Sequence, residues 1–178
     1  MSKQRAIFTV KAAVVLILAL AAIYAATLSI SGKSKPINIG QPAPDFTLED
    51  LNGEERQLSE LRGRSVLLNF WASWCNPCVN ELPLLNEAYK LLKTNGENIT
   101  FIAINIGEKS ENIQKFIDRY DLELPIWLDE QRNVNGLYRV SAMPLTLLID
   151  PSGDIVEIHA GELTDIADII ALAGRSGL

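Results

Sequence analysis

The only two cysteines of this chain lie three positions apart, and their setting restricts the possible fold more than any other feature. Cys75 and Cys78 enclose Asn76 and Pro77, and they lie shortly after an apolar run at residues 66–71. A strand that delivers a Cys-x-x-Cys motif to the first turn of a helix is typical of a thiol-disulfide redox centre. Two sulfurs at this spacing can form a disulfide, and a helix N-terminus stabilises a thiolate. We therefore expect Cys75 to be exposed and to attack, and Cys78 to be shielded.

A long uncharged apolar run at residues 12–30 precedes the motif, with basic residues on both sides. A helix over this run would be long enough to cross about 30 Å of hydrocarbon. The larger number of Lys and Arg residues before it predicts that residues 1–11 are cytoplasmic. We expect a single-pass protein of the cell membrane, anchored by residues 12–30, with its catalytic domain on the extracytoplasmic side. A cleaved signal peptide is the alternative, although the apolar region of such peptides is normally shorter.

The charge of the chain is divided as unevenly as its hydrophobicity. Residues 1–35 carry five of the 16 Lys and Arg residues and none of the 22 Asp and Glu residues, so residues 36–178 have a formal net charge of −11. A surface this acidic repels nucleic acid and anionic lipid. We therefore expect no nucleic-acid partner.

Residues 31–39 are expected to form a polar linker, and residues 40–178 a single domain in which strand and helix patterns alternate. The expected elements are a hairpin with its turn at Asn52-Gly53, a strand at 65–71, a helix from Cys75 to about Asn95, a strand at 99–106, a helix opened by Ser110, a strand at 125–128, a short helix at 134–138, strands at 145–149 and 154–159, and a helix at 164–173. This order predicts an α/β domain with a mixed sheet that is parallel in its centre.

Several segments besides the Cys-x-x-Cys motif resemble the thioredoxin superfamily, and more closely its membrane-anchored ResA/TlpA-type thiol-disulfide oxidoreductases, which serve cytochrome c maturation. The segments that carry the resemblance are Pro-Asp-Phe-Thr-Leu at 44–48, Asn-Phe-Trp-Ala-Ser-Trp-Cys-Asn-Pro-Cys at 69–78, Glu-Leu-Pro at 81–83, Asn-Ile-Gly-Glu at 105–108, Ala-Met-Pro-Leu-Thr at 142–146 and Ile-Asp-Pro-Ser-Gly at 149–153. The resemblance implies a thioredoxin-like mixed sheet flanked by helices, with an N-terminal β-hairpin and a central helix-strand insertion. It also implies a redox-active Cys75–Cys78 disulfide and no other cofactor. Zinc requires four ligands, and two cysteines with one distant histidine do not supply them.

The resemblance further implies an acid/base role for Glu81, three residues after Cys78 on the same side of the predicted helix. Thioredoxin has a buried aspartate on the strand before its motif, and the matching residue here is Asn69, which cannot titrate. Glu81 would therefore take up or return a cysteine proton. The alternative is an ordinary exposed helical glutamate.

A substrate-facing surface is implied by the same resemblance. Pro144 matches the cis-proline of the superfamily, which leaves backbone groups of Met143 to bind an extended substrate. Trp74, Asn76 and Pro77 would complete this surface. The alternatives are a trans turn at Pro144 and an ordinary exposed Asn76. This chain differs from close ResA-type proteins at Asn76, where they carry an acidic residue.

The implied function is the extracytoplasmic reduction of protein disulfides, with the Cys-x-x-Cys-His cysteines of apocytochrome c as substrate before haem attachment. A membrane dithiol protein of the CcdA/DsbD type would donate the electrons. The alternatives are another extracytoplasmic thiol-disulfide reductase or oxidase, such as a spore-envelope type, a peroxiredoxin-like peroxidase and a non-catalytic peptide-binding module. A peroxidase requires a Pro-x-x-x-Thr-x-x-Cys setting, which Cys75 lacks, and the presence of both cysteines argues against a binding module.

Overall fold

The computed structural model of this chain describes residues 15–20 and 36–176. Residues 15–20 are helical. The predicted cytoplasmic segment 1–11, most of the predicted anchor 12–30 and most of the linker 31–39 lie outside the described residues. In the part of the chain that is described, no helix is both long enough and apolar enough to cross a membrane.

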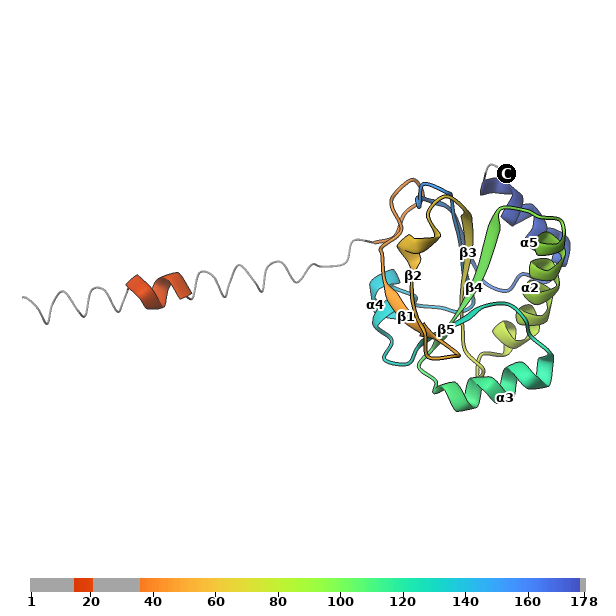
Figure 1. The fold of residues 1–178 in the computed structure, drawn as a ribbon, viewed down its shortest axis with the longest axis horizontal. Helices are drawn as coiled ribbons and strands as arrows, with labels where there is room; N and C mark the ends of the chain where they lie inside the picture. The colour runs from red at the N-terminus through yellow and green to blue at the C-terminus, as the bar shows by residue number, and fades with distance from the viewer. Residues whose placement is uncertain (1–14, 21–35, 177–178) are drawn as a thin grey trace, which may run out of the picture. The chain divides into compact units, whose positions relative to one another are not determined.

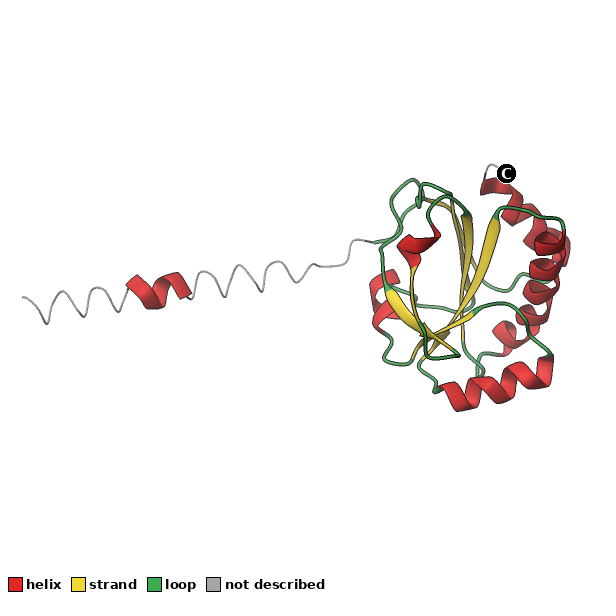
Figure 2. Cartoon of the chain, in the orientation of Figure 1, coloured by secondary structure: helices red, strands yellow, loops and turns green. Residues whose placement is uncertain are grey.

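A seven-stranded mixed sheet with the order β2-β1-β5-β4-β3-β6-β7 forms the centre of the domain (Figures 1 and 2). Its strands are β1 (Thr47–Asp50), β2 (Glu55–Gln57), β3 (Ser65–Trp71), β4 (Ile99–Ile106), β5 (Ile126–Asp129), β6 (Leu145–Ile149) and β7 (Ile155–Ala160). The neighbours β3, β4 and β5 run parallel, whereas all other pairs are antiparallel. The predicted mixed sheet with a parallel centre and an N-terminal hairpin is confirmed.

Helices cover both faces of this sheet. They are α2 (Asn76–Thr94), α3 (Ser110–Tyr120), α4 (Asn133–Tyr138) and α5 (Ile166–Ala173), with short 3-10 turns at Leu58–Leu61 and Gly174–Ser176. Figure 1 shows α2 and α5 on one side of the sheet and α4 on the other. The last helix begins two residues later than predicted, because the Asp165 side chain accepts the backbone N–H of Ala167 at 2.8 Å and caps it.

The central strands are mostly apolar because each contributes side chains to two cores. On β3, Leu67 and Trp71 pack into the core under α2, α3 and α5, whereas Leu68 and Phe70 pack into the core under α4. Strands that are buried on both faces show this continuous pattern. Asn69 lies between Leu67 and Trp71 on the same face, so β3 carries an amide into the core under α2.

The register of β3 and β4 places the ends of the two strands side by side. Trp71 pairs with Asn105 in parallel, one residue before β4 ends. The loop that follows β3 carries Cys75, and the loop that follows β4 carries Glu108. The redox motif therefore lies at the carboxyl edge of the parallel strands, beside the loop that leads to α3.

Candidate active site

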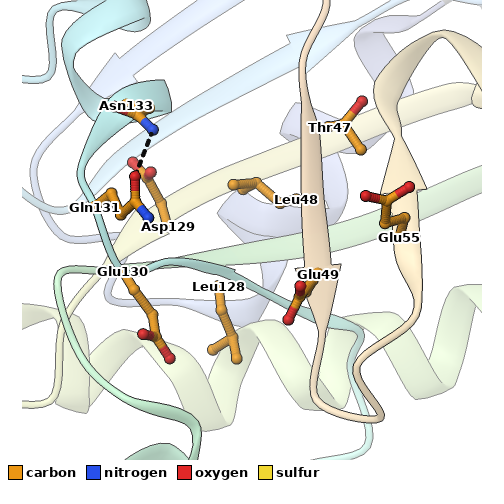
Figure 3. Close-up of a pocket in the computed structure, with 9 residues that line it drawn as sticks. All are labelled: Thr47, Leu48, Glu49, Glu55, Leu128, Asp129, Glu130, Gln131 and Asn133. Atoms are coloured by element: carbon orange, nitrogen blue, oxygen red, sulfur yellow. Dashed lines mark hydrogen bonds between the residues drawn. The ribbon is translucent and has the colours of Figure 1, made fainter.

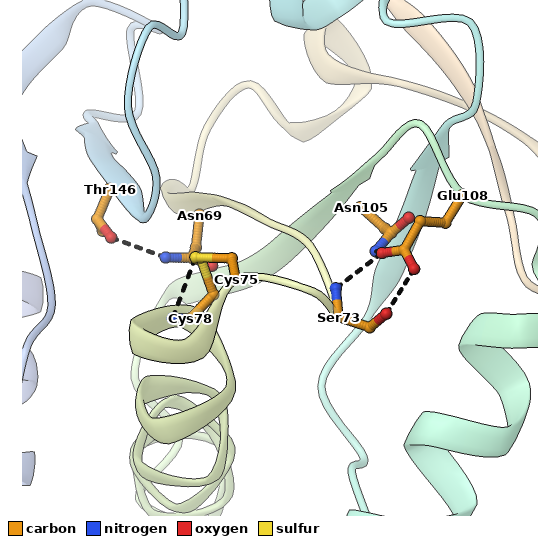
Figure 4. Close-up of a disulfide and its surroundings, with 7 residues drawn as sticks. All are labelled: Asn69, Ser73, Cys75, Cys78, Asn105, Glu108 and Thr146. Carbon is orange, nitrogen blue, oxygen red and sulfur yellow. Dashed lines mark hydrogen bonds between the residues drawn. A yellow bond between two sulfur atoms is a disulfide. The ribbon is translucent and has the colours of Figure 1, made fainter.

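Cys75 and Cys78 form a disulfide at the N-terminus of α2 (Figure 4). The Cα atoms are 5.3 Å apart, and the two sulfurs are bonded. Cys75 is the N-cap residue of the helix, and its Sγ accepts the backbone N–H of Cys78 at 3.4 Å. The first turn of α2 contains no acidic side chain. Nothing on this turn therefore opposes the partial positive charge that the helix end presents to a thiolate.

The prediction that Cys75 is exposed was wrong for the disulfide form. Cys75 is only 8% exposed and Cys78 is 1% exposed. Both cysteines belong to the hydrophobic core under α2. Cys75 is nevertheless the more accessible of the two, which agrees with its assignment as the attacking residue.

The residues between and before the cysteines form the surface around the disulfide. Trp74 is 59% exposed, Asn76 is exposed and Pro77 is half-buried. An exposed tryptophan next to a reactive sulfur offers a large apolar contact area. These three residues therefore lie where a docking surface was predicted.

The Met143–Pro144 peptide bond is cis, as the resemblance implied. Pro144 is buried and directly precedes β6. Met143 is half-buried and packs against the hydrophobic core that includes both cysteines. The predicted substrate segment thus packs against the same hydrophobic core as the redox motif.

Glu81 is almost completely buried on the same face of α2 as Cys78. The alternative of an exposed helical glutamate is wrong. Neither carboxyl oxygen makes a hydrogen bond of good geometry. A carboxylate in such a site loses its hydration and is compensated only in part by its neighbours, so the neutral acid is favoured.

Burial raises the pKa of Glu81 to about 8, and the nearby negative charge of Glu162 adds to the rise. The backbone N–H of Leu163 and the side chains of Asn69 and Thr146 lower the pKa, but by less. The carboxyl group thus titrates in the range in which thiols exchange. Such a group can both accept and return a proton during disulfide exchange.

A buried polar pair next to Glu81 was not assigned from the sequence. The Nδ2 of Asn69 donates a hydrogen bond to the Oγ1 of Thr146 at 2.9 Å (Figure 4). The Oδ1 of Asn69 has no hydrogen-bond partner among the described residues. The available signal was the position of Asn69 on the buried strand, but its partner depends on the pairing of β3 with β6.

A second polar cluster, also not assigned from the sequence, lies on the other side of the disulfide in Figure 4. Ser73, Asn105 and Glu108 form it, and all three of its hydrogen bonds end on the Glu108 carboxylate. Asn105 and Glu108 belong to a segment that carries the resemblance, yet no role was assigned to them.

A surface pocket of about 350 Å³ lies elsewhere, between the hairpin and the end of β5 (Figure 3). It is lined by Thr47, Leu48, Glu49, Glu55, Leu128, Asp129, Glu130, Gln131 and Asn133. None of them is a predicted site residue. The most deeply buried acid, Asp129, accepts the backbone N–H groups of Val134 and Asn135 at 3.2 and 2.7 Å, so its carboxylate is already used at the start of α4.

Comparison with known proteins gives a consistent set of relatives. A sequence model of the AhpC/TSA family matches residues 39–158. The thiol-disulfide oxidoreductase ResA of Geobacillus kaustophilus is 38% identical over 164 residues, which cover 92% of either chain. The ResA of Bacillus subtilis is 37% identical over 165 residues, which cover 93% of this chain and 90% of that one.

Among solved structures, a Chlorobium tepidum protein described as a DsbE-type thiol:disulfide interchange protein is similar in fold. Its TM-score is 0.69 at 32% sequence identity, and the match covers 78% of this chain and 95% of that one. The relatives found by sequence and by structure thus share thiol-disulfide chemistry.

Proposed function

Because the chain belongs to the AhpC/TSA family and to its ResA-type thiol-disulfide oxidoreductases, we propose that it reduces protein disulfides on the outer side of a cell membrane. We assign the Cys-x-x-Cys-His cysteines of apocytochrome c as its substrate, before haem attachment. One observation carries the proposal: a Cys75–Cys78 disulfide caps α2 while a buried carboxyl group, Glu81, lies one turn further along the same helix face.

The exchange begins from the reduced protein. The Cys75 thiolate attacks one sulfur of the target disulfide, which forms a mixed disulfide and leaves the second target sulfur as a thiolate that takes up a proton. The Glu81 carboxylate then accepts the proton of Cys78, and the Cys78 thiolate attacks the Sγ of Cys75. This step closes the Cys75–Cys78 disulfide and expels the first target sulfur as a thiolate, which takes up the proton that Glu81 returns. Two electrons have passed from the dithiol to the target.

The docking surface lies on both sides of the sulfurs. Trp74 supplies exposed aromatic area, and Met143 offers its backbone groups in front of the cis-proline. An extended segment around the target disulfide would pair with this backbone. Asn76 and Pro77 would contact the same segment from the first turn of α2.

Membrane attachment through residues 12–30 is part of the proposal. The alignment with the Geobacillus kaustophilus ResA spans 92% of this chain. The part left unaligned is shorter than residues 1–35, so the alignment has to extend into that segment. A tether would keep the domain near freshly translocated polypeptides. It would also keep the domain near a membrane dithiol donor of the CcdA/DsbD type, which returns two electrons to the Cys75–Cys78 disulfide.

The proposal is tested by trapping. In Cys78→Ala the mixed disulfide at Cys75 cannot be resolved, so targets should remain attached in native membranes until a thiol reductant releases them. We expect apocytochrome c among the released proteins, and the double variant Cys75→Ala/Cys78→Ala should release none. If the released proteins lacked Cys-x-x-Cys-His segments, the assignment of apocytochrome c as the substrate would be contradicted. Equal trapping by Cys75→Ala alone would contradict the assigned order of attack.

A further inference from the structure

The segment that leads into α2 is a tight turn, and a carboxylate of a neighbouring loop binds one of its two central residues. The backbone N–H of Cys75 donates to the carbonyl oxygen of Ala72 at 3.1 Å, so Ser73 and Trp74 are the two central residues of the turn. The backbone N–H of Ser73 donates to the Oε2 of Glu108 at 2.7 Å, and the Ser73 hydroxyl donates to the Oε1 (Figure 4). Both donors of Ser73 therefore end on one carboxylate.

Glu108 is itself held by the sheet. The Nδ2 of Asn105 donates to its Oε2 at 2.9 Å, and the Asn105 side chain is completely buried. Asn105 pairs with Trp71 in the parallel ladder of β3 and β4. Hydrogen bonds to a charged acceptor belong to the stronger class, and this carboxylate accepts three. The turn that carries Trp74 is thus connected through Glu108 to a rigid strand.

This connection acts on Trp74 more than on the reacting sulfurs. Cys75 closes the same turn, but it is also the N-cap residue of α2 and is bonded to Cys78 in this structure. Trp74 is 59% exposed, and the conformation of its turn sets the point and the direction from which its side chain leaves the backbone. Two χ angles remain free once the backbone is set, so a fixed turn greatly narrows the region that the ring can reach.

We propose that Glu108 is a positioning residue that holds Trp74 ready for docking of a protein substrate. The inference rests on the proposed function, because it names a determinant of docking at the same site. A preorganised aromatic side chain contributes contact area without the entropy cost of ordering it on binding. A small disulfide such as oxidised glutathione does not span Trp74, so its reaction with Cys75 is independent of Glu108.

The test uses the full-length protein in detergent, with Glu108→Ala as the loss variant and Glu108→Gln as the rescue. The amide oxygen of Gln accepts the two N–H donors, and its NH₂ group donates to the Ser73 hydroxyl. Glu111→Ala, at an exposed position in the first turn of α3, is the matched control. Reduction of an oxidised Cys-x-x-Cys-His peptide is compared with reduction of oxidised glutathione, with dithiothreitol as the electron source in both assays.

For Glu108→Ala we expect KM for the peptide to rise about 10-fold, the loss of roughly one good contact, with kcat and the glutathione rate within about twofold of the wild-type values. Glu108→Gln and Glu111→Ala should keep KM near that of the wild type. An unchanged KM in Glu108→Ala would overturn the inference. An equal fall in the rates with both substrates would also overturn it, because it would place the effect on the sulfurs or on the fold.

A spectroscopic measurement separates this inference from the proposed function. With fluorine-labelled tryptophan the protein has three resonances, and Trp74→Phe identifies the one from Trp74. Glu108→Ala should shift or broaden that resonance and leave those of the buried Trp71 and Trp127 in place; no change at Trp74 would overturn the positioning role. A wild-type protein that reduces glutathione but no peptide would refute the proposed function and the docking role together, while the Trp74 resonance would still report whether Glu108 fixes the turn.

Discussion

Asn69 and Thr146 are joined by a hydrogen bond of 2.9 Å between the Nδ2 of one and the Oγ1 of the other, in a fully buried part of the domain. The bond connects β3, which leads to Cys75, with β6, which follows the cis-proline. Glu81 lies beside this pair, whose side chains lower the pKa of Glu81 against the larger effect of burial. The strand that leads to the sulfurs and the strand that follows the substrate segment, which pair along the sheet, are therefore also joined by a side-chain hydrogen bond next to the titrating acid.

Thr146→Val should destabilise the disulfide form by about 1–3 kcal/mol. The substitution keeps the shape of the side chain but removes the oxygen, so the Nδ2 of Asn69 remains buried without an acceptor. Denaturant unfolding at neutral pH measures the change. Thr146→Ser, which keeps the hydroxyl and loses only a methyl group, is the matched control. A Val variant as stable as the wild type would show that the bond contributes nothing to the folded state.

Burial of Glu81 should make stability fall as the pH rises. Its pKa is about 8 in the folded protein and near 4.5 when exposed, so the folded state binds the extra proton between these values. The free energy of unfolding therefore falls by an amount of order 2–5 kcal/mol between about pH 4.5 and about pH 8. Above that range this contribution is level.

The measurement is the difference in unfolding free energy between wild type and Glu81→Gln across this range. Other titrating groups affect both proteins equally and cancel. The unfolding free energy of the Gln variant should rise relative to that of the wild type as the pH rises. This difference should stop growing above about pH 8. A difference that does not change with pH would show that Glu81 is already ionised in the folded protein.

Glu81→Gln should also remove one inflection from the pH profile of exchange. Resolution of the mixed disulfide needs an ionised Glu81 to accept the Cys78 proton. In the wild type this step should accelerate as the pH rises through about 8, and the Gln variant should lose that inflection and react about 10-fold or more slowly near neutral pH.

Stopped-flow reaction of the reduced protein with the aromatic disulfide dithiobis-nitrobenzoate resolves this step. The first release of chromophore reports attack by Cys75, and the second reports attack by Cys78. Only the second phase should change in Glu81→Gln. An identical second phase in the two proteins would remove Glu81 from the mechanism and leave it with a structural role.

Much of the fold was predictable because its signals are local. The continuous apolar runs at β3 and β4, the spacing along α2 and the Asn52-Gly53 turn each specify one element, and all of these elements are present. The order of strands and helices was sufficient to predict a mixed sheet with a parallel centre. The resemblance added the cis bond before Pro144, which no local pattern reveals.

The contacts within the site were harder to predict because they depend on strand register. Asn69 meets Thr146 only because β3 pairs with β6, and Glu108 reaches Ser73 only because β3 and β4 end together. The exposure of Cys75 was predicted wrongly because the motif indicates accessibility of the thiol, whereas Cys75 in the disulfide form is part of the hydrophobic core. The apolar run at residues 12–30 gives a strong membrane prediction, and most of it lies outside the described residues.

The central claim is that electrons flow from Cys75 and Cys78 to a target disulfide. The direct measurement mixes equal amounts of the reduced full-length protein and an oxidised peptide that contains Cys-x-x-Cys-His, then quenches with acid at equilibrium and counts free thiols by mass spectrometry. A reductant should leave most of the peptide reduced and most of the protein with its Cys75–Cys78 disulfide. A peptide that stays oxidised beside a protein that stays reduced would contradict the account and identify the protein as an oxidant.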